Sequence, residues 1–162
     1  MLEPTEYRIL ANLQAALQQI TVGGGYHYDV HGTAVKLDPN QDVEALIEPG
    51  APRPFIVIEV LAEDWDYFDK PDGLLLSLPM TIHWVHDTSP DQDVSRMQTY
   101  FRGCADVEKA ITVDRGRGGL ATETLIRKRA FEAAVDGSQV WAMVDITIKL
   151  YRTYGQPNGE PS

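Results

Sequence analysis

The sequence predicts an α+β fold, in which two helices pack on one face of a mostly antiparallel sheet. Two segments carry apolar residues at helical spacing. Five others are rich in β-branched or aromatic residues that alternate or run together in the manner of strands. The predicted order of elements, α, β, β, β, α, β, β, is typical of this class.

The length and composition indicate one domain over residues 1–154 and a disordered tail at 155–162, which holds Gly, Pro and polar residues. At 162 residues and 18.1 kDa, one core suffices. Hydrophobic residues make up 43% and charged residues 23%, as in an average globular protein, so we expect folding without metal or disulfide support. The single cysteine, Cys104, excludes an intrachain disulfide, and its apolar surroundings in the sequence predict a buried thiol.

The net charge and the hydropathy of the chain argue against nucleic acids and membranes as partners. The formal net charge of -10 opposes broad nucleic-acid binding, which depends on Lys and Arg neutralising phosphates. The first 30 residues lack the basic start and the apolar run of a signal peptide, and no apolar stretch has membrane-spanning length. We therefore expect a soluble protein that is neither exported nor inserted into a membrane.

The first half of the chain begins with a helix, predicted by apolar residues at spacings of 3, 4 and 3: Leu10, Leu13, Leu17 and Ile20. Pro4 suits its first helical position, and the three glycines at 23–25 end it. Residues 26–37 then predict a strand, because they are rich in aromatic and β-branched side chains. A turn-rich stretch follows at 38–54, with one possible helical turn around 43–47.

The middle of the chain predicts two more strands. Residues 55–61 form a short apolar run, as in a strand buried on both faces. The acidic and aromatic residues of 63–70 are interpreted as an exposed loop. The period of two over 74–85 predicts a long strand with one buried face. Pro79 cannot donate a ladder hydrogen bond, so we expect this strand at an edge of the sheet or with a bulge.

A second helix is predicted to begin with Ser89 as N-cap, Pro90 at the first helical position and Gln92 completing a capping box. It ends before Gly116, and 115–119 is too rich in glycine for an element, so we expect a mobile loop. The expected buried stripe of this helix consists of Val94, Met97, Phe101, Cys104, Val107 and Ile111.

The last two strands are predicted to form a hairpin around the dipeptide at 136–137, Asp-Gly, which tolerates the backbone angles of a tight turn. A two-residue turn sets Lys128 opposite Asp145, a favourable pair. It also sets the arginines beside Lys128 opposite apolar residues, so a bulge or another register stays open. The buried face of the last strand is expected to carry Val140, Ala142, Val144, Ile146, Ile148 and Leu150.

Three polar residues, His27, Asp29 and His31, are two apart on a predicted strand and would share one face. Two imidazoles and a carboxylate could bind a metal, as in a small metal-dependent enzyme, yet a solvent-exposed strand face has the same pattern. The exposed face is the interpretation we favour, with no metal site. His83 and His86 are three apart, point to opposite faces and are expected at the surface or rim.

No catalytic residue or cofactor is predicted, because neither the serines nor Cys104 lie in an activating context. Arg115 and Arg117 lie in the glycine-rich loop, where they could face DNA or be solvated.

Large aromatic side chains among acids are typical of an interaction surface. In the segment 63–70, Trp65, Tyr67 and Phe68 therefore predict a contact to a partner, with packing on the domain's own core as the alternative.

The pattern as a whole resembles the tail terminator (tail completion) proteins and related minor tail and neck proteins of long-tailed bacteriophages. The resemblance rests on the amphipathic helix at 9–20, the Gly-Tyr-His-Tyr-Asp-Val segment at 25–30, and the strand at 54–61. It continues in the long strand at 74–85, which leads into a helix that ends before a glycine loop, and in the closing strand at 145–153. These features are an order of elements and loose local patterns without an invariant motif.

The resemblance covers roughly residues 5–153. It implies a homohexameric ring on the last ring of the tail-tube protein, which ends tube polymerisation and joins the tail to a neck or head-completion protein. It also implies a location in the tail or neck of the virion, assembly in the host cytoplasm, DNA as a passing occupant of the lumen, and no catalytic residues. A head-tail stopper or adaptor is the alternative within the same group. The acidic and aromatic segment at 63–70 departs from the family pattern.

Overall fold

The computed structural model describes residues 4–61, 66–70, 73–87, 95–133 and 138–153. The predicted hairpin turn at 136–137, the tail and Trp65 lie outside these residues. The model contains two α-helices, α1 (Thr5–Gln18) and α2 (Arg96–Val113), and two short 3₁₀ turns, η1 (Val22–Gly24) and η2 (Glu44–Leu46). Its strands are β1 (Gly32–Lys36), β2 (Phe55–Val60), β3 (Asp66–Lys70), β4 (Gly73–Asp87), β5 (Glu123–Ala133) and β6 (Gln139–Thr153).

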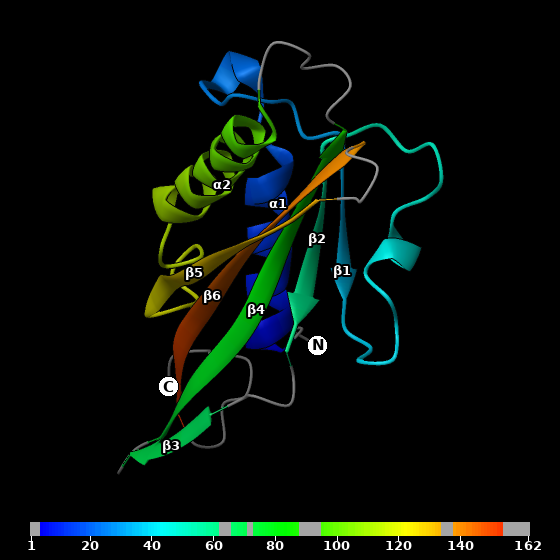
Figure 1. Ribbon diagram of the computed structural model, residues 1–162. Helices are drawn as coiled ribbons and strands as arrows, with labels where there is room; N and C mark the ends of the chain where they lie inside the picture. Colours follow the sequence, from blue (N-terminus) through cyan, green and yellow to red (C-terminus); the bar gives the residue numbers. More distant parts are fainter. Residues whose placement is uncertain (1–3, 62–65, 71–72, 88–94, 134–137, 154–162) are drawn as a thin grey trace.

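The strands form one sheet in the order β1-β2-β4-β6-β5, and β3 also pairs with β4 (Figure 1). β1 and β2 are parallel, and every other pair is antiparallel. The predicted α+β class with a mostly antiparallel sheet is confirmed. The long strands β4 and β6 pair over 15 residues and form the centre of the sheet, so β1 and β5 lie at its opposite edges.

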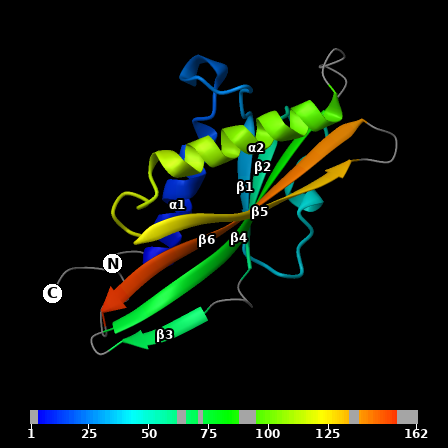
Figure 2. The ribbon, with the colours of Figure 1, turned by 60° about the vertical axis from the view of Figure 1, so that its left-hand side comes forward.

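The main core lies between the helices and one face of the sheet. Alternate residues of β4 and β6 are buried there, as the period of two predicted. Both helices contribute side chains to this same cluster (Figure 2). Its members include Ile9, Leu13 and Leu17 of α1, Cys104, Val107 and Ile111 of α2, Leu76, Leu78, Met80, Ile82 and Trp84 of β4, and Val140, Ala142, Val144, Ile146, Ile148 and Leu150 of β6.

The other face of the sheet is covered at one end by the stretch 38–54. Ile47 packs there against Val57 of β2 and Val85 of β4. The predicted helical turn in this stretch is confirmed as η2. His83 and His86 are each only 7% exposed, so the expectation that they lie at the surface or rim is wrong. His83 lies on this covered face beside Trp141, whereas His86 lies on the other face, where its ring packs against Tyr28 and Trp84.

Pro79 lies in a central strand, so the prediction of an edge strand or bulge is wrong. β2 pairs with residues 80–85 of β4 and β3 with residues 73–77, which leaves Pro79 between the two neighbours. The Pro79 carbonyl accepts a hydrogen bond from the Leu61 N–H. Because both backbone groups of a residue in an antiparallel strand point the same way, the missing N–H faces this gap, and the β6 ladder loses no hydrogen bond.

Two other predicted boundaries are wrong. The strand expected over 26–37 is confirmed only as β1, since 26–31 has no strand pairing. The segment 63–70 is not all loop, because 66–70 forms β3, whose Lys70 pairs with Gly73 of β4.

The second helix begins at Arg96, with Ser95 as N-cap and Gln98 completing a capping box. The predicted cap at 89–92 lies outside the described residues. The predicted buried stripe is wrong for Met97 and Phe101, which are 47% and 52% exposed.

The β5–β6 hairpin has the predicted pairing of Lys128 with Asp145. A bulge resolves the conflict in register for Arg127, since the pairing shifts between Ile126 and Lys128 and leaves Arg127 as the extra residue. Arg129 still lies opposite Val144, and its guanidinium pairs with Glu108 of α2. Of the two open possibilities, the bulge is therefore confirmed.

Candidate functional site

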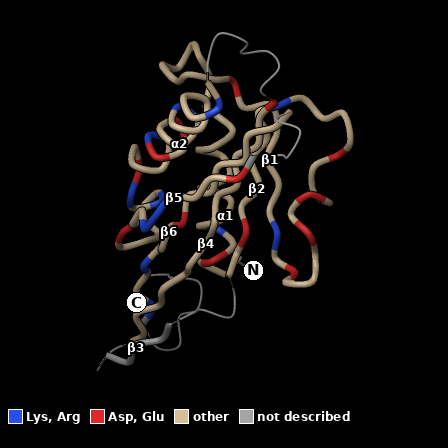
Figure 3. The backbone as a smooth tube through the Cα atoms, in the orientation of Figure 1, with Lys and Arg blue, Asp and Glu red and all other residues tan. Residues whose placement is uncertain are grey.

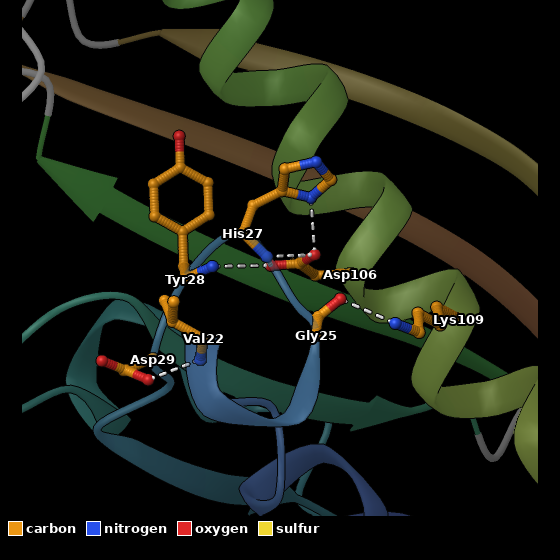
Figure 4. Close-up of polar contacts among 7 residues, drawn as sticks. All are labelled: Val22, Gly25, His27, Tyr28, Asp29, Asp106 and Lys109. Carbon is orange, nitrogen blue, oxygen red and sulfur yellow. Dashed lines mark hydrogen bonds and ion pairs between the residues drawn. The ribbon is translucent and has the colours of Figure 1, made fainter.

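The segment 22–30 is held against α2 by one buried carboxylate, that of Asp106, whose side chain is 2% exposed (Figure 4). Its oxygens accept hydrogen bonds from the backbone N–H groups of His27, at 2.9 and 3.0 Å, and Tyr28, at 3.0 Å. The His27 ring nitrogen Nδ1 lies 2.8 Å from Asp106 Oδ1. One turn further along α2, Lys109 donates to the Gly25 carbonyl at 2.7 Å.

The possible metal trio does not assemble. His27 contacts Asp106, whereas the Asp29 carboxylate accepts from the Val22 N–H at 2.7 Å and points away from the His27 ring (Figure 4). The geometric premise, a shared strand face, is wrong because β1 begins at Gly32. Within the ranges that the structure describes, no group of three His, Cys, Asp or Glu side chains is placed to hold a metal ion.

Arg117 is buried, at 0% exposure, so it does not face DNA as the glycine-rich loop suggested. Its guanidinium donates to the carbonyls of Ile111, at 2.5 Å, and Asp114, and so satisfies backbone groups at the end of α2. Burial lowers the pKa of this guanidinium, and nearby Asp114 opposes the change. Arg115 is exposed, so it is the residue of the predicted pair that remains available to a partner.

We expect Arg117→Met to lower the free energy of unfolding by about 2 kcal/mol, because the carbonyls of Ile111 and Asp114 lose the guanidinium as a donor while the aliphatic stem is kept. Arg115→Met is the matched control and should change the stability by less than about 0.5 kcal/mol. Urea denaturation measures both. Equal stabilities of the two variants would contradict the capping role of Arg117.

A polar network crosses the sheet face opposite the helices. Lys36 on β1 pairs with Glu59 on β2 at 2.6 Å, and Glu59 Oε1 lies 3.8 Å from His83 Nε2 on β4. Trp141 Nε1 on β6 donates to His83 Nδ1 at 2.9 Å. Burial lowers the pKa of His83, as does Lys36, against the opposing effects of Glu59 and Asp145. The neutral ring fits this arrangement, since Nδ1 must be unprotonated to accept from Trp141.

This network predicts a loss of stability in mild acid. The pKa of His83 is lower in the folded protein than the ordinary value of 6.5, so the unfolded chain takes up the proton first as the pH falls. Stability present above about pH 6.5 is therefore lost below it. We expect the melting temperature to fall more between pH 7.5 and 5.5 for the native chain than for His83→Gln, which cannot titrate. Parallel pH profiles would contradict this.

Cys104 is buried in the main core, as predicted, and burial raises the pKa of its thiol to about 11. A thiol with this pKa is not ionised near neutral pH and is a poor nucleophile.

Of the three aromatic residues predicted to contact a partner, Tyr67 and Phe68 lie on β3, opposite Leu76 and Leu75 of β4.

Two regions of the surface carry charge of mainly one sign. One is basic, although the net charge of the whole chain is -10, and the other is acidic. The first, which we call the basic face, consists of α2 and β5, where Lys and Arg gather (Figure 3). Residues 96–132 hold eight of the 14 basic residues, of which Arg117 is buried, and five of the 24 acidic ones. The second, the acidic segment, is 38–48 around η2, which holds four acids and no base. Sequence reasoning missed both, although the charge counts along the chain were a usable signal.

The basic face also carries exposed apolar side chains. Phe101 of α2 is 52% exposed and Phe131 of β5 is 36% exposed, and each ring packs against Tyr100, with centroids 5.3 and 5.1 Å apart. Met97 adds a third exposed apolar side chain, at 47% exposure. An aromatic cluster surrounded by charge has the composition of a protein interface.

A scan against protein-family models gives no match to this chain, and a search of curated proteins also gives none. In the part of the chain that the structure describes, no helix has both the length and the apolar character to cross a membrane.

Proposed function

We propose that the protein is a structural component of a phage tail, a tail terminator that assembles as a homohexameric ring at the head-proximal end of the tail tube. In this role it ends polymerisation of the tail-tube protein and joins the tail to a neck or head-completion protein. It carries out no bond-making chemistry. The resemblance of its element order to such proteins supports the proposal.

The observation that carries the proposal is a single sheet with both edges available on opposite sides of the molecule. In the described residues, β1 pairs with β2 and β5 pairs with β6, and each has no strand on its outer side. Edge strands offer unpaired backbone groups to a neighbouring chain. Two distinct edges on one subunit suit a head-to-tail interface, which closes into a ring when the rotation per subunit permits.

The shape of the sheet also supports the proposal. The ends of β4 and β6 that lie near β3 extend past both helices (Figures 1 and 2). Tyr151, near this end of β6, is 39% exposed, so the extension offers a large apolar side chain as well as β3 itself. An extension of this kind can contact a second ring, such as the tail tube or the neck.

The charge is compatible with DNA passing through a lumen. A net charge of -10 repels phosphates, so DNA can slide without being bound. With Arg117 buried, the glycine-rich loop presents Arg115 alone of the predicted pair, which is a weak attraction.

Negative-stain electron microscopy tests the proposal. We expect the purified protein to form rings with a central hole, and to decorate one end of tubes assembled from the tail-tube protein of the same genome. Particles that remain monomeric at every concentration and leave tube ends bare would overturn it. A head-tail stopper or adaptor would also form rings, but it would be located in the connector of the particle and would not cap the tube.

A further inference from the structure

The sheet face opposite the helices has a hollow of about 470 Å³ beside the acidic segment. Its lining includes Asp42 and Glu44 of the acidic segment, His83 of β4, Glu132 of β5 and Trp141 of β6. The three carboxylates are exposed, and the indole is half-buried. Two segments far apart in the sequence, the acidic segment and the end of β5, therefore bring their negative charge to one aromatic ring.

The chain supplies no positive charge to this hollow. Among the described residues, no Lys or Arg lines it, and none of its three carboxylates forms a hydrogen bond or an ion pair. His83 is neutral there, because its Nδ1 accepts from Trp141. An adjacent hollow of about 290 Å³, which Trp141 also lines, differs in that Arg53 is part of its lining. A hollow surrounded by charge of one sign attracts a group of the opposite sign, so the first hollow is suited to a cation from outside the chain.

The indole of Trp141 indicates which kind of cation fits. Its position is fixed by the hydrogen bond from Nε1 to His83 Nδ1, at 2.9 Å, and by the edge contact of the two rings, whose centroids are 5.8 Å apart. Of the aromatic side chains, Trp attracts a cation over its ring most strongly. A planar guanidinium can stack on the indole and also pair with carboxylates through its forked N–H groups, which a Lys ammonium cannot do. The hollow therefore favours an arginine side chain.

His83 is a second, independent indication of an occupant. Its side chain is 8% exposed and lines the hollow, and in the described part of the chain its Nε2 has no hydrogen-bond partner. Glu59 Oε1, at 3.8 Å, is too distant to accept a hydrogen bond. Because Nδ1 accepts from Trp141, the ring proton is on Nε2, and a buried donor without an acceptor is unfavourable. An arginine residue of a protein brings a backbone carbonyl together with its cation and can supply the missing acceptor.

We propose that this hollow binds an arginine side chain of a partner protein, with the guanidinium against the Trp141 ring and within reach of the surrounding carboxylates. The partner has a basic surface, because a chain with a net charge of -10 attracts such a surface, whereas a second copy brings the same negative charge. The contact does not rest on the proposed function, whose ring uses the two edges of the sheet. It adds a different protein on the face of the sheet.

Two-dimensional NMR of the full chain tests the hollow with N-acetyl-arginine amide as the probe. We expect the indole N–H signal of Trp141, identified by its loss in Trp141→Phe, to shift and saturate with a Kd of about 1–10 mM, since exposed ion pairs and a single cation–π contact are weak. N-acetyl-citrulline amide has nearly the same shape without the charge and should bind at least about tenfold more weakly. N-acetyl-lysine amide should bind about threefold more weakly. No shift with the arginine probe, or equal binding of either of the other two, would overturn the proposal.

Two double variants separate the hollow from the net charge of the chain. Glu44→Gln with Glu132→Gln removes two of the carboxylates that line the hollow and should raise the Kd for the arginine probe by about tenfold. Glu48→Gln with Glu123→Gln is the matched control, because it makes the same change in net charge in the same two parts of the chain, the acidic segment and β5, outside the lining of the hollow. Thermal melts check that both variants fold. Equal weakening in the two variants would show an effect of net charge alone and would contradict the site.

Two further measurements identify the source of the arginine. Free L-arginine should bind no more tightly than the capped probe, and a Kd at least about tenfold lower would indicate a site for a small molecule and overturn the assignment to a partner protein. Sedimentation velocity should show the Glu44→Gln and Glu132→Gln variant self-associating as the native chain does. If this variant alone loses the self-association of the native chain, the arginine belongs to a second copy, and the assignment to a different protein is overturned.

Discussion

Replacing Asp106 with Ala is expected to lower the free energy of unfolding by about 3 kcal/mol, because the backbone N–H groups of His27 and Tyr28 then lose their acceptors. Both donors are partly buried, and a buried donor without an acceptor costs more than an average hydrogen bond contributes. Urea denaturation measures the loss. Hydrogen exchange should show faster exchange at the amides of 22–30 than in β4 and β6, since this segment loses its anchor first.

Two further variants separate backbone anchoring from the contact between the two side chains. His27→Ala removes the ring, whose side chain is 50% exposed, and should cost less than about 1 kcal/mol. Asp106→Asn should give an intermediate loss, because its amide group presents a donor where one carboxylate oxygen accepted. A loss of less than about 0.5 kcal/mol in Asp106→Ala would contradict the anchoring role.

This anchor shows why the sequence predicted the sheet better than the loops. Alternation along β4 and β6 indicates which side chains face the main core, so that face followed from the period of two. The expectation of a single buried face is wrong for β4, where residues 80–86 are all buried because 38–54 covers part of the second face. The segment 26–31 has the aromatic and β-branched composition of a strand, yet its conformation depends on Asp106, 79 residues from His27 in the sequence. Local composition carries no signal for such a partner.

The helix α2 illustrates ambiguity between competing local signals. Both Ser89 and Ser95 precede a Gln three residues later, and the structure places the capping box at Ser95. The predicted buried stripe of α2 is wrong by one position at Phe101, because Tyr100, at 8% exposure, is the buried aromatic residue. Adjacent apolar residues at helical spacing leave two choices of face, and only packing against the sheet decides between them.

The sequence also did not predict that β1 and β5 are the edge strands of the sheet. The sequence places β1 and β5 far apart, but whether they form opposite edges depends on the strand order, which pairing sets. Arg117 could have been identified in part, because a basic residue shortly after a helix often binds its terminal carbonyls. The surrounding glycines favoured a mobile loop instead.

Gly103→Ala is expected to destabilise the protein by about 2 kcal/mol, although the same change in an ordinary helix interior is stabilising by about 1 kcal/mol. Gly103 lies within α2, against the buried indole of Trp84 on β4. A Cβ at this position would lie 2.6 Å from Trp84 Cε3, and the ring has no room to move because it is 0% exposed. The overlap therefore outweighs the gain in helix propensity.

A double-mutant cycle isolates this contact, with Trp84→Phe as the second change. The smaller ring removes part of the indole that the new methyl group would strike. Thermal or urea denaturation should therefore show Gly103→Ala costing less in the Trp84→Phe background than in the native chain. Gly23→Ala is the control for adding a methyl group, since a Cβ there meets nothing within 4 Å, and it should be close to neutral. Strict additivity in the cycle would show that the close approach of α2 to β4 does not depend on Gly103.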